Sequence, residues 1–355
     1  MKSKMIKAVS AVLVISLLLC TFAACNTSET ENYEKEFDVE LKKETTTELV
    51  YELPEDVNPL TGMANLSEGA KGKRPVAIMV ADAPEARPQW GMMTPDLTVE
   101  GLIGEDKMGM MWVYGDYTKI PNQVGPIAPA NDGFAELAQG MNALYIHWDG
   151  ETGEDVDSID GGMYQGTYFF NDSSKNQALE YQRATSKAYI ESAISTIGFE
   201  MSFETAEYAP YQIAFEGGEF SRTYDDNSGL CGKITIDFLE NLIYSFQYNK
   251  DSKCYQQYIN NELVVDENGN PRGFDNVIYL FVKTETVNGE VKWVLDTEER
   301  GTYVSRAYGQ RIMWKVDSET GALKLYDTDG ETPLIINSGN VWLGIVPNGS
   351  KVTVQ

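Results

Sequence analysis

The sequence predicts an α+β fold, in which an N-terminal α/β layered domain is followed by a β-rich antiparallel C-terminal domain. Two observations predict this arrangement. In the first half of the chain, short apolar runs alternate with helical patterns, as they do where helices cover a sheet. In the second half the helical period disappears, and short apolar runs are separated by turn dipeptides. A length of 355 residues suits two domains.

Four segments of the first half are expected to form strands. The clearest is PVAIMV at residues 75–80, a continuous apolar run of the kind found in buried strands. The other three are residues 97–103, 108–114 and 143–147. Because helical patterns follow the third and fourth of these segments, we expect the strands to form a sheet that is covered by helices.

Two helices are expected in this half. Asn131 or Asp132 can cap the first, since apolar residues recur at helical spacing directly after them. Thr185 or Ser186 can cap the second, which is expected to stop at Gly198 because glycine commonly ends a helix.

The second half contains six strand-like runs that are separated by turn signals. The runs are residues 233–238, 243–248, 277–282, 291–295, 311–316 and 341–346. The turn signals are Asn268-Gly269, Asn288-Gly289, Thr320-Gly321 and Asp329-Gly330. Short strands punctuated in this way indicate a domain built from antiparallel hairpins.

The N-terminus is expected to direct export. Residues 1–24 combine three lysines with an apolar stretch that is too short to span a bilayer, which is typical of a signal peptide. Phe-Ala-Ala then precedes Cys25, and this resembles a bacterial lipobox, in which the cysteine becomes the lipidated first residue. The other interpretation is an ordinary signal peptide that is cut near Ala24. We favour lipidation of Cys25.

The remaining boundaries follow from composition. Residues 25–57 are rich in Glu, Thr and Lys and poor in large apolar residues, so they are predicted to be a disordered acidic tether. The N-terminal α/β domain is assigned to residues 58–217. The C-terminal β-rich domain is assigned to residues 218–355.

The chain is strongly acidic, with 54 Asp and Glu against 28 Lys and Arg and a formal net charge of −26. Binding of DNA or RNA through phosphates needs clustered cations, so the charge argues against nucleic acid as a partner. The chain has one histidine, which excludes every zinc site built on two or more histidines. No cofactor is expected, apart from the calcium ion considered below.

Glu100, His147 and Asp149 are candidate catalytic residues. Glu100 interrupts an apolar run and is therefore expected to be buried. A buried carboxyl group has a raised pKa and can act as an acid. Alternatively, Glu100 can form a structural ion pair with Arg74 or Arg87. His147 ends a strand-like run and can act as a general base beside Asp149, or it can be a hydrogen-bonded structural residue. We favour the structural interpretation in each case, and no G-x-S-x-G nucleophile motif accompanies the histidine.

Two further sites are considered. An acidic loop contains Asp155, Asp157 and Asp160, which together with loop carbonyls can bind Ca²⁺. The spacing of these residues is not that of an EF-hand, so we favour a solvated acidic loop without a metal ion. Cys231 and Cys254 can form a disulfide in an exported chain, or remain two separate thiols, which is slightly favoured.

Short motifs also occur in a particular order along the chain. They include Asn58-Pro-Leu-Thr-Gly62, Ala86-Arg-Pro-Gln89, Val99-Glu100, Gly125-Pro126 and Gly339-Asn-Val-Trp342. This series resembles the YerB-type lipoprotein family of Gram-positive bacteria, whose members have paired N- and C-terminal domains of unknown function. The chain departs from the family after Gly125-Pro126, where the family's arginines are absent.

The resemblance implies a lipoprotein that is exported and anchored to the outer face of the cell membrane of a Gram-positive bacterium. It implies no activity, because the family has none assigned. We expect a non-enzymatic binding or scaffolding protein of the cell envelope, attached to the membrane through its lipid and partnered by envelope proteins or glycan. The alternative is a cell-envelope hydrolase that uses carboxylates on glycan or peptide.

Overall fold

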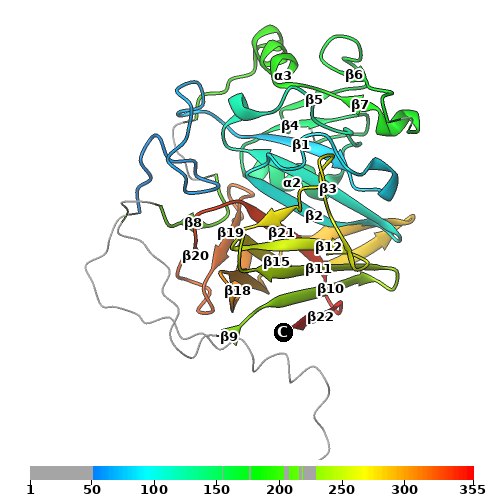
Figure 1. Cartoon of the computed structure of the whole chain (residues 1–355). Helices are drawn as coiled ribbons and strands as arrows, with labels where there is room; N and C mark the ends of the chain where they lie inside the picture. Colours follow the sequence, from blue (N-terminus) through cyan, green and yellow to red (C-terminus); the bar gives the residue numbers. More distant parts are fainter. Residues whose placement is uncertain (1–50, 154, 176, 204–207, 216–217, 219–228) are drawn as a thin grey trace, which may run out of the picture.

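The computed structural model describes residues 51–153, 155–175, 177–203, 208–215, 218 and 229–355. The structure is mostly β, with two large sheets stacked on each other and few helices (Figure 1). One sheet has twelve strands and is mixed, and the other has six antiparallel strands. In the described part of the chain, no helix is both long and apolar enough to cross a membrane.

The twelve-stranded sheet takes strands from both halves of the chain. The N-terminal half supplies β1 (Val76–Ala81), β2 (Leu97–Gly104), β3 (Lys107–Tyr114), β4 (Leu144–His147) and β5 (Ser158–Asp160). The C-terminal half supplies β9 (Gly229–Leu230), β15 (Asn276–Val287), β16 (Glu290–Val294), β17 (Glu299–Ser305), β18 (Tyr308–Val316), β19 (Leu323–Tyr326) and β21 (Val341–Pro347). The order is β19-β18-β17-β15-β16-β2-β3-β1-β4-β5, with β21 paired to β15 and β2, and β9 paired to β18.

Strand β21 joins the two halves. It runs parallel to β15 on one side and to β2 on the other, so that Val341 is opposite both Asn276 and Leu97. Its residues 341–346 are all buried, as expected of a central strand that is covered on both faces. Beyond the end of this pairing, β16 makes one bridge to β2. A strand from near the C-terminus thus lies in the middle of the sheet, between the two halves.

The six-stranded sheet packs on one face of the larger sheet. Its strands are β10 (Lys233–Leu239), β11 (Leu242–Asn249), β12 (Cys254–Ile259), β13 (Glu262–Leu263), β14 (Gly273–Phe274) and β22 (Lys351–Val354). Buried residues alternate with less buried ones along β10, which is the pattern of a strand with one face on the core. The ring of Phe246 on β11 lies 4.4 Å from that of Trp342 on β21, so the two sheets are in direct contact.

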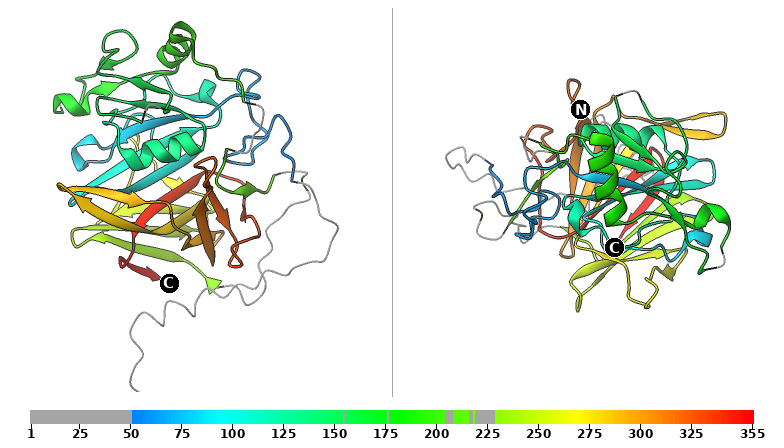
Figure 2. Two further views of the ribbon diagram at one scale, coloured as in Figure 1. Left: turned by 180° about the vertical axis from the view of Figure 1, so that it is seen from behind. Right: turned by 90° about the horizontal axis from the view of Figure 1, so that it is seen from above.

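Helix α2 (Asp132–Gly140) covers the opposite face of the larger sheet, as seen from behind in Figure 2. The side chain of Asn131 accepts a hydrogen bond from the Gly133 N–H and so caps the helix. The ring of Phe134 packs edge-on against that of Trp293 on β16 at 4.7 Å. Helix α2 therefore belongs to the N-terminal half but packs on a strand of the C-terminal half.

Helix α3 (Lys187–Ala193) lies at the end of the molecule remote from the C-terminus (Figure 1). Ser186 caps it by accepting from the Tyr189 N–H, and a π-helical turn (Ile194–Gly198) extends it to Gly198, whose φ is 88°. Single 3-10 turns cover Pro84–Ala86, Tyr117–Lys119 and Leu179–Tyr181. Two short ladders pair β6 (Phe170–Asn171) with β7 (Arg183–Ala184) and β8 (Gln212–Ile213) with β20 (Ile335–Ile336).

All ten predicted strands and both predicted helices are found, with ends that differ by a few residues. The predicted α/β layering of the first half is only partly correct, because the described residues there form a mostly β structure. The prediction of a purely antiparallel second half is wrong for β21, which is parallel to both neighbours. The physical reason is that turn dipeptides report on strands that are adjacent in sequence, whereas β21 is positioned by distant segments. The predicted domain boundary at residue 217 falls outside the described residues.

Close packing between α2 and β16 generates a testable prediction. A Cβ added at Gly133 would lie 2.4 Å from the Trp293 ring. We expect Gly133→Ala to lower the free energy of unfolding by about 1–3 kcal/mol, because overpacking outweighs the roughly 1 kcal/mol by which alanine is favoured over glycine in a helix.

Urea unfolding measures this effect. Gln139→Ala, on the exposed side of α2, is the control and should change the unfolding free energy by less than about 0.5 kcal/mol. A Gly133→Ala protein that is as stable as the original would contradict the packing.

Candidate functional site

The two sheets enclose a group of charged and polar side chains, which we call the inter-sheet cluster. Its members are Asp82, Arg87, Glu100, Tyr244, Gln257 and Arg272. Asp82 follows β1 and Glu100 is on β2, whereas Tyr244 is on β11 and Arg272 comes just before β14. These four side chains lie almost entirely away from solvent, the most exposed being Asp82 at 8%. The cluster therefore brings together residues that are up to 190 positions apart.

Glu100 is placed in this layer by the alternation of side chains along β2. Residues 98 and 100 share the face that meets the smaller sheet, whereas Gly101 faces α2 and the Trp293 ring. The Arg272 guanidinium donates to Glu100 at 3.2 Å and to Thr98 at 3.2 Å. The Gln257 amide donates to the second oxygen of Glu100, also at 3.2 Å. Both carboxylate oxygens are thus bonded to the C-terminal half.

Neither of the predicted partners of Glu100 is bonded to it. The buried Arg74 side chain forms an ion pair with the exposed Asp157 at 2.5 Å, within the N-terminal half. Arg87 forms one with Asp82 at 2.9 Å, within the cluster. The side chain that pairs with Glu100 instead comes from the other half of the chain.

Asp82 forms a second link between the sheets. One of its oxygens accepts from Arg87, and the other accepts from the Tyr244 hydroxyl at 2.6 Å. Burial and then the charge of Asp82 raise the pKa of Tyr244 well above its usual value, so the phenol stays protonated and remains a donor. Although burial opposes the charge of Arg87, the Asp82 carboxylate keeps the pKa of this guanidinium above its ordinary value.

The Glu100 carboxyl titrates well above its ordinary range. Its pKa is raised to about 7, first by burial and then by the nearby charge of Asp82. The Arg272 guanidinium opposes this shift. The Trp342 indole also favours the charged carboxylate, although its N–H makes no hydrogen bond of regular geometry. Glu100 therefore exchanges a proton near neutral pH while enclosed between the sheets.

Several other polar atoms in this part of the core lack partners within the described structure. They are the indole nitrogen of Trp112, Nε of Arg272 and Oε1 of Gln89. The Arg272 guanidinium lies 5.9 Å from the Trp112 ring centre and 5.1 Å from that of Phe274. Each unpaired buried polar group costs about 1–3 kcal/mol, so maximal stability does not explain the composition of this layer.

His147 ends β4 and is only 2% exposed. Its Nδ1 donates to the backbone carbonyl of Asp149 at 2.9 Å, and its ring stacks on Tyr145 at 5.4 Å. Nε2 is buried with no partner among the described residues. The Asp149 carboxylate is exposed, and its backbone, with φ of 58°, makes the contact with the histidine. This arrangement does not set Asp149 to orient His147 as a general base.

The carboxylates of the predicted calcium loop have different partners. Asp157 pairs with Arg74, and Asp160 accepts from the N–H groups of Asp149 and Gly162 at 2.8 Å each. Asp155 is exposed. In the described part of the chain, no three His, Cys, Asp or Glu side chains converge as metal ligands. Asp160 is therefore held by backbone N–H groups of the loop, and Asp157 is held by Arg74.

The two cysteines are not joined by a disulfide. Cys231 is buried, and its carbonyl accepts from the Tyr255 hydroxyl at 2.6 Å. Cys254 is half-buried on β12, where its thiol lies 3.2 Å from the Ser252 hydroxyl. Cys25 lies outside the described residues, so its lipidation stays a prediction.

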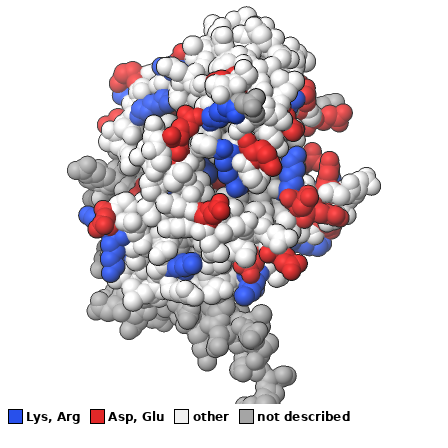
Figure 3. All heavy atoms as spheres, turned by 45° about the vertical axis from the view of Figure 1, so that its right-hand side comes forward, with Lys and Arg blue, Asp and Glu red and all other residues white. Residues whose placement is uncertain are grey.

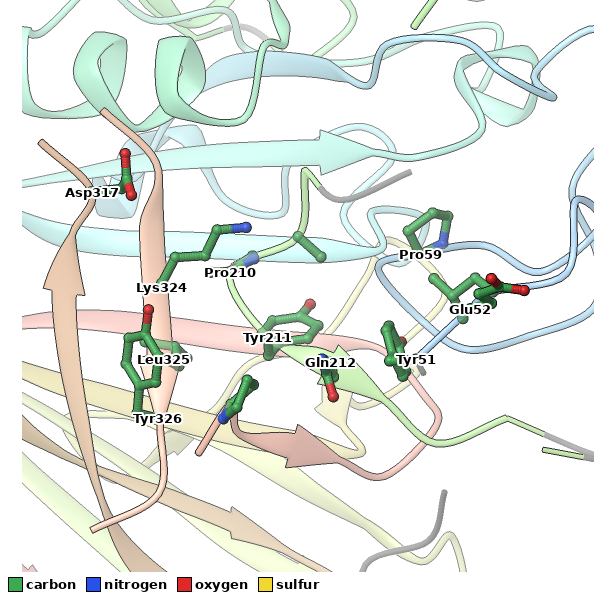
Figure 4. Close-up of a pocket in the computed structure, with 13 residues that line it drawn as sticks. Tyr51, Glu52, Pro59, Pro210, Tyr211, Gln212, Asp317, Lys324, Leu325 and Tyr326 are labelled. Atoms are coloured by element: carbon green, nitrogen blue, oxygen red, sulfur yellow. The ribbon is translucent and has the colours of Figure 1, made fainter. Parts of the chain in front are cut away.

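An open cleft of about 720 Å³ lies where segments from both halves meet. Three tyrosines and three prolines are among its lining residues, namely Tyr51, Tyr211, Tyr326, Pro59, Pro210 and Pro333. In Figure 4, Lys324 and Tyr326 are on one wall, Glu52 and Pro59 are on the opposite wall, and Tyr211 and Gln212 lie between them. This cleft was not predicted, because its wall segments are distant in sequence and carry no recognisable motif.

Two lining tyrosines are fixed by their hydroxyl groups. Tyr51 donates to the carbonyl of Ile213 at 3.2 Å and accepts from its N–H at 2.8 Å. Tyr211 donates to the carbonyl of Leu60 at 3.0 Å. Asp317, also in the lining, accepts from the backbone and hydroxyl of Thr320, and these bonds lower its pKa. The cleft therefore has fixed rings and one carboxylate that stays ionised.

The titration of Glu100 generates a testable prediction. Because its pKa of about 7 in the folded chain is above its ordinary value of 4.5, the folded protein keeps a proton that the unfolded chain loses between these values. The free energy of unfolding should therefore fall as the pH rises from about 5 to 8, by on the order of 3 kcal/mol from this group. Glu100→Gln should lack this fall.

Urea unfolding at several pH values measures how steeply the free energy of unfolding falls with pH. This slope reports the titration of Glu100, whereas a loss of stability due to an unpaired Arg272 would be the same at every pH. Glu105→Gln, in the exposed turn after β2, should keep the slope of the original protein. Equal slopes for the original protein and Glu100→Gln would mean that Glu100 is ionised throughout this range.

The chain is similar to known proteins in both sequence and structure. Residues 60–205 match the family described as "Protein of unknown function (DUF3048) N-terminal domain", and residues 234–343 match its C-terminal domain. "Putative lipoprotein YerB" from Bacillus subtilis strain 168 is 23% identical over 306 residues, which is 84% of this chain and 88% of that protein. The crystal structure of B. subtilis YerB matches with a TM-score of 0.70 and 20% identity, over 84% of this chain and 99% of that chain.

These matches confirm the family that the sequence motifs indicate, and the structural match shows that the fold is shared. The motif residues Arg87, Gln89 and Glu100 lie in or beside the inter-sheet cluster. The chain belongs to the DUF3048 family of proteins of unknown function and is a distant homologue of B. subtilis YerB.

Proposed function

We propose that this protein is a non-enzymatic binding or scaffolding lipoprotein, held by a lipid on Cys25 at the outer face of the cell membrane of a Gram-positive bacterium. The signal-like residues 1–24 and the small residues before Cys25 support export and lipidation. The name of the B. subtilis relative, a putative lipoprotein, agrees with this anchor. Residues 25–50 would act as the tether between the lipid and the folded part. Residues 51–57, which the sequence assigned to the tether, belong instead to the folded part, where Tyr51 bonds to Ile213 and Val57 is buried.

The observation that carries the binding proposal is the contrast between the inter-sheet cluster and the cleft. Glu100 is fully buried, and both of its oxygens are bonded to Arg272 and Gln257. A substrate cannot reach a carboxylate in that position without separating the sheets. The cleft is open and combines fixed aromatic rings with a few polar groups, as ligand sites usually do.

The lining of the cleft also favours binding over hydrolysis. Its two carboxylates are Glu52 and Asp317, which Figure 4 shows on opposite sides. Glycoside hydrolysis needs two carboxyl groups that flank one bond, and one of them must be protonated. Asp317 has a lowered pKa and caps its own turn, so it is not suited to donate a proton.

A hydrolase remains the second candidate because of one observation. The pKa of Glu100 is near 7, in the range that suits a general acid, and a motion that opened the sheets would expose it.

Membrane attachment through Cys25 is tested by cell fractionation. We expect Cys25→Ser to move the protein from the membrane fraction to the medium, because only the acyl chains would hold so acidic a protein at an anionic surface. Cys231→Ser, which changes a cysteine of the folded part, should stay in the membrane fraction. Retention of the Cys25→Ser protein would contradict the lipid anchor.

Binding and hydrolysis are separated by measuring both on envelope glycan and peptide substrates. We expect retention of an envelope ligand that is weakened by Tyr326→Ala in the cleft, with no turnover. If turnover is found and is lost in Glu100→Gln or His147→Ala while the melting temperature stays nearly constant, the protein is an enzyme and the binding proposal is wrong.

A further inference from the structure

We propose that the cleft binds a neutral oligosaccharide, whose sugar rings pack on the lining tyrosines and whose hydroxyl groups bond to polar side chains between them. This inference rests on the proposed binding function and names the ligand class for the cleft shown in Figure 4. Four features of the lining carry it: the paired backbone of the walls, the mixed charges, the unpartnered polar side chains and the accessible rings.

The backbone of the cleft walls is already engaged in hydrogen bonds. The Leu325 N–H donates to the Pro210 carbonyl at 2.7 Å, and the Leu325 carbonyl accepts from the Leu334 N–H at 2.9 Å. The Gln212 N–H donates to the Leu334 carbonyl, also at 2.9 Å. The three prolines of the lining have no N–H to offer. A peptide that docks as an added strand needs free N–H and C=O groups along an edge, so these walls do not favour that mode.

The charges of the lining do not select an ionic ligand. They belong to Glu52, Asp317 and Lys324. Hydrogen bonds from Thr320, and then the charge of Lys324, lower the pKa of Asp317, so this carboxylate already has a cation near it. A cationic ligand would therefore have to compete with Lys324.

The charge of the molecule as a whole also disfavours an anionic glycan. The chain has a formal net charge of −26, which repels polyanions. Acidic and basic side chains are interspersed on the face in Figure 3, and several acidic groups lie together at its right-hand edge. A neutral ligand avoids this repulsion and makes no demand for a charged partner.

Three polar side chains of the lining have no hydrogen-bond partner among the described residues. They are the Gln212 amide, the Tyr326 hydroxyl and the Glu52 carboxylate. In Figure 4, Gln212 lies between the wall that carries Glu52 and the wall that carries Tyr326. The amide and the phenol can each donate and accept, and the carboxylate accepts. Because a sugar hydroxyl also donates and accepts, it can pair with any of the three.

The tyrosine rings provide the apolar contact that a sugar needs. Tyr51 and Tyr326 are half-buried, so part of each ring is accessible. The Tyr51 hydroxyl is bonded to both backbone groups of Ile213, so little rotamer freedom is lost when a ligand covers this ring. Nζ of Lys315 lies 4.3 Å from the centre of the Tyr326 ring, so a second cation there would be repelled. The C–H groups of a neutral sugar carry no such penalty and pack on aromatic faces.

The cleft volume of about 720 Å³ is suited to a short oligosaccharide. Sites for small ligands usually enclose about 300–1,000 Å³ and combine aromatic walls with a few polar groups that fix orientation. Because the cleft is open, a longer sugar chain can extend beyond it.

The probe is the neutral tetrasaccharide of β-1,4-linked N-acetylglucosamine, and its partner is the complete mature chain with Cys25→Ser to remove the lipid. Isothermal titration calorimetry with up to about 10 mM sugar should show binding, because it detects dissociation constants into the millimolar range. Raising the salt from about 50 to 300 mM should change the affinity by less than about twofold, because a neutral ligand has no charge to be screened. A titration without binding would overturn the proposal.

Two matched pairs of variants locate the site. Tyr326→Ala should weaken binding by about fivefold or more, whereas Tyr189→Ala, on α3 where this ring is 40% exposed, should change it by less than about twofold. Gln212→Ala should weaken binding by about threefold or more, and Gln139→Ala, on the exposed side of α2, should leave it unchanged. Equal losses in Tyr326→Ala and Tyr189→Ala would place the sugar outside the cleft and overturn the proposal.

Thermal melting of each variant checks that it folds. If Tyr326→Ala does not fold, Tyr326→Phe and Gln212→Ala decide the matter. Tyr326→Phe keeps the ring but loses the hydroxyl, so it should weaken binding by about threefold. If neither of these two variants affects a sugar that binds, the cleft is not its site.

A parallel titration with a neutral peptide, (Gly-Pro-Tyr)₃, separates this inference from the binding function. If the peptide binds and Tyr326→Ala weakens its binding, while the sugar does not bind, the cleft is a ligand site but its ligand is not a sugar. If neither probe binds, both the ligand class and the assignment of the cleft are wrong.

Discussion

The parallel pairing of β21 with both β2 and β15 is the constraint on which the rest of the structure depends. Without it, strand pairing between the two halves within the larger sheet would be reduced to a single bridge between β16 and β2. The pairing fixes the register of Thr98 and Glu100 against Trp342 and Gly344. It thereby decides which polar groups from the larger sheet face the smaller one. The inter-sheet cluster is a consequence of that register.

The inter-sheet cluster contributes more to the specificity with which the two sheets pack on each other than to the net stability of the fold. A buried ion pair gains little over apolar packing, but a misplaced one leaves a charge uncompensated at a cost of about 3–5 kcal/mol. Glu100 with Arg272, and Asp82 with Tyr244, therefore penalise any arrangement in which the smaller sheet slides along the larger one. Apolar contacts such as that of Phe246 with Trp342 supply attraction without that penalty.

Local patterns predicted local structure well and distant pairing poorly. Asn131, Ser186 and Gly198 marked the helix ends because capping depends on a few neighbouring residues. Glu100 was recognised as a candidate because a charge inside an apolar run is visible in sequence. Its partner Arg272 was not, since it lies in a loop 172 residues away and no local pattern relates the two. The cleft was missed for the same reason.

The position of β21 also has a consequence for how the chain matures. Strand β21 begins at residue 341, after every other strand of the larger sheet along the chain. Until it arrives, the edge of β2 exposes unpaired N–H and C=O groups over an apolar strand, a state that invites aggregation and proteolysis. A chain that stopped before residue 341 would keep this open edge, so loss of β21 alone would leave the apolar strand β2 unpaired on one side.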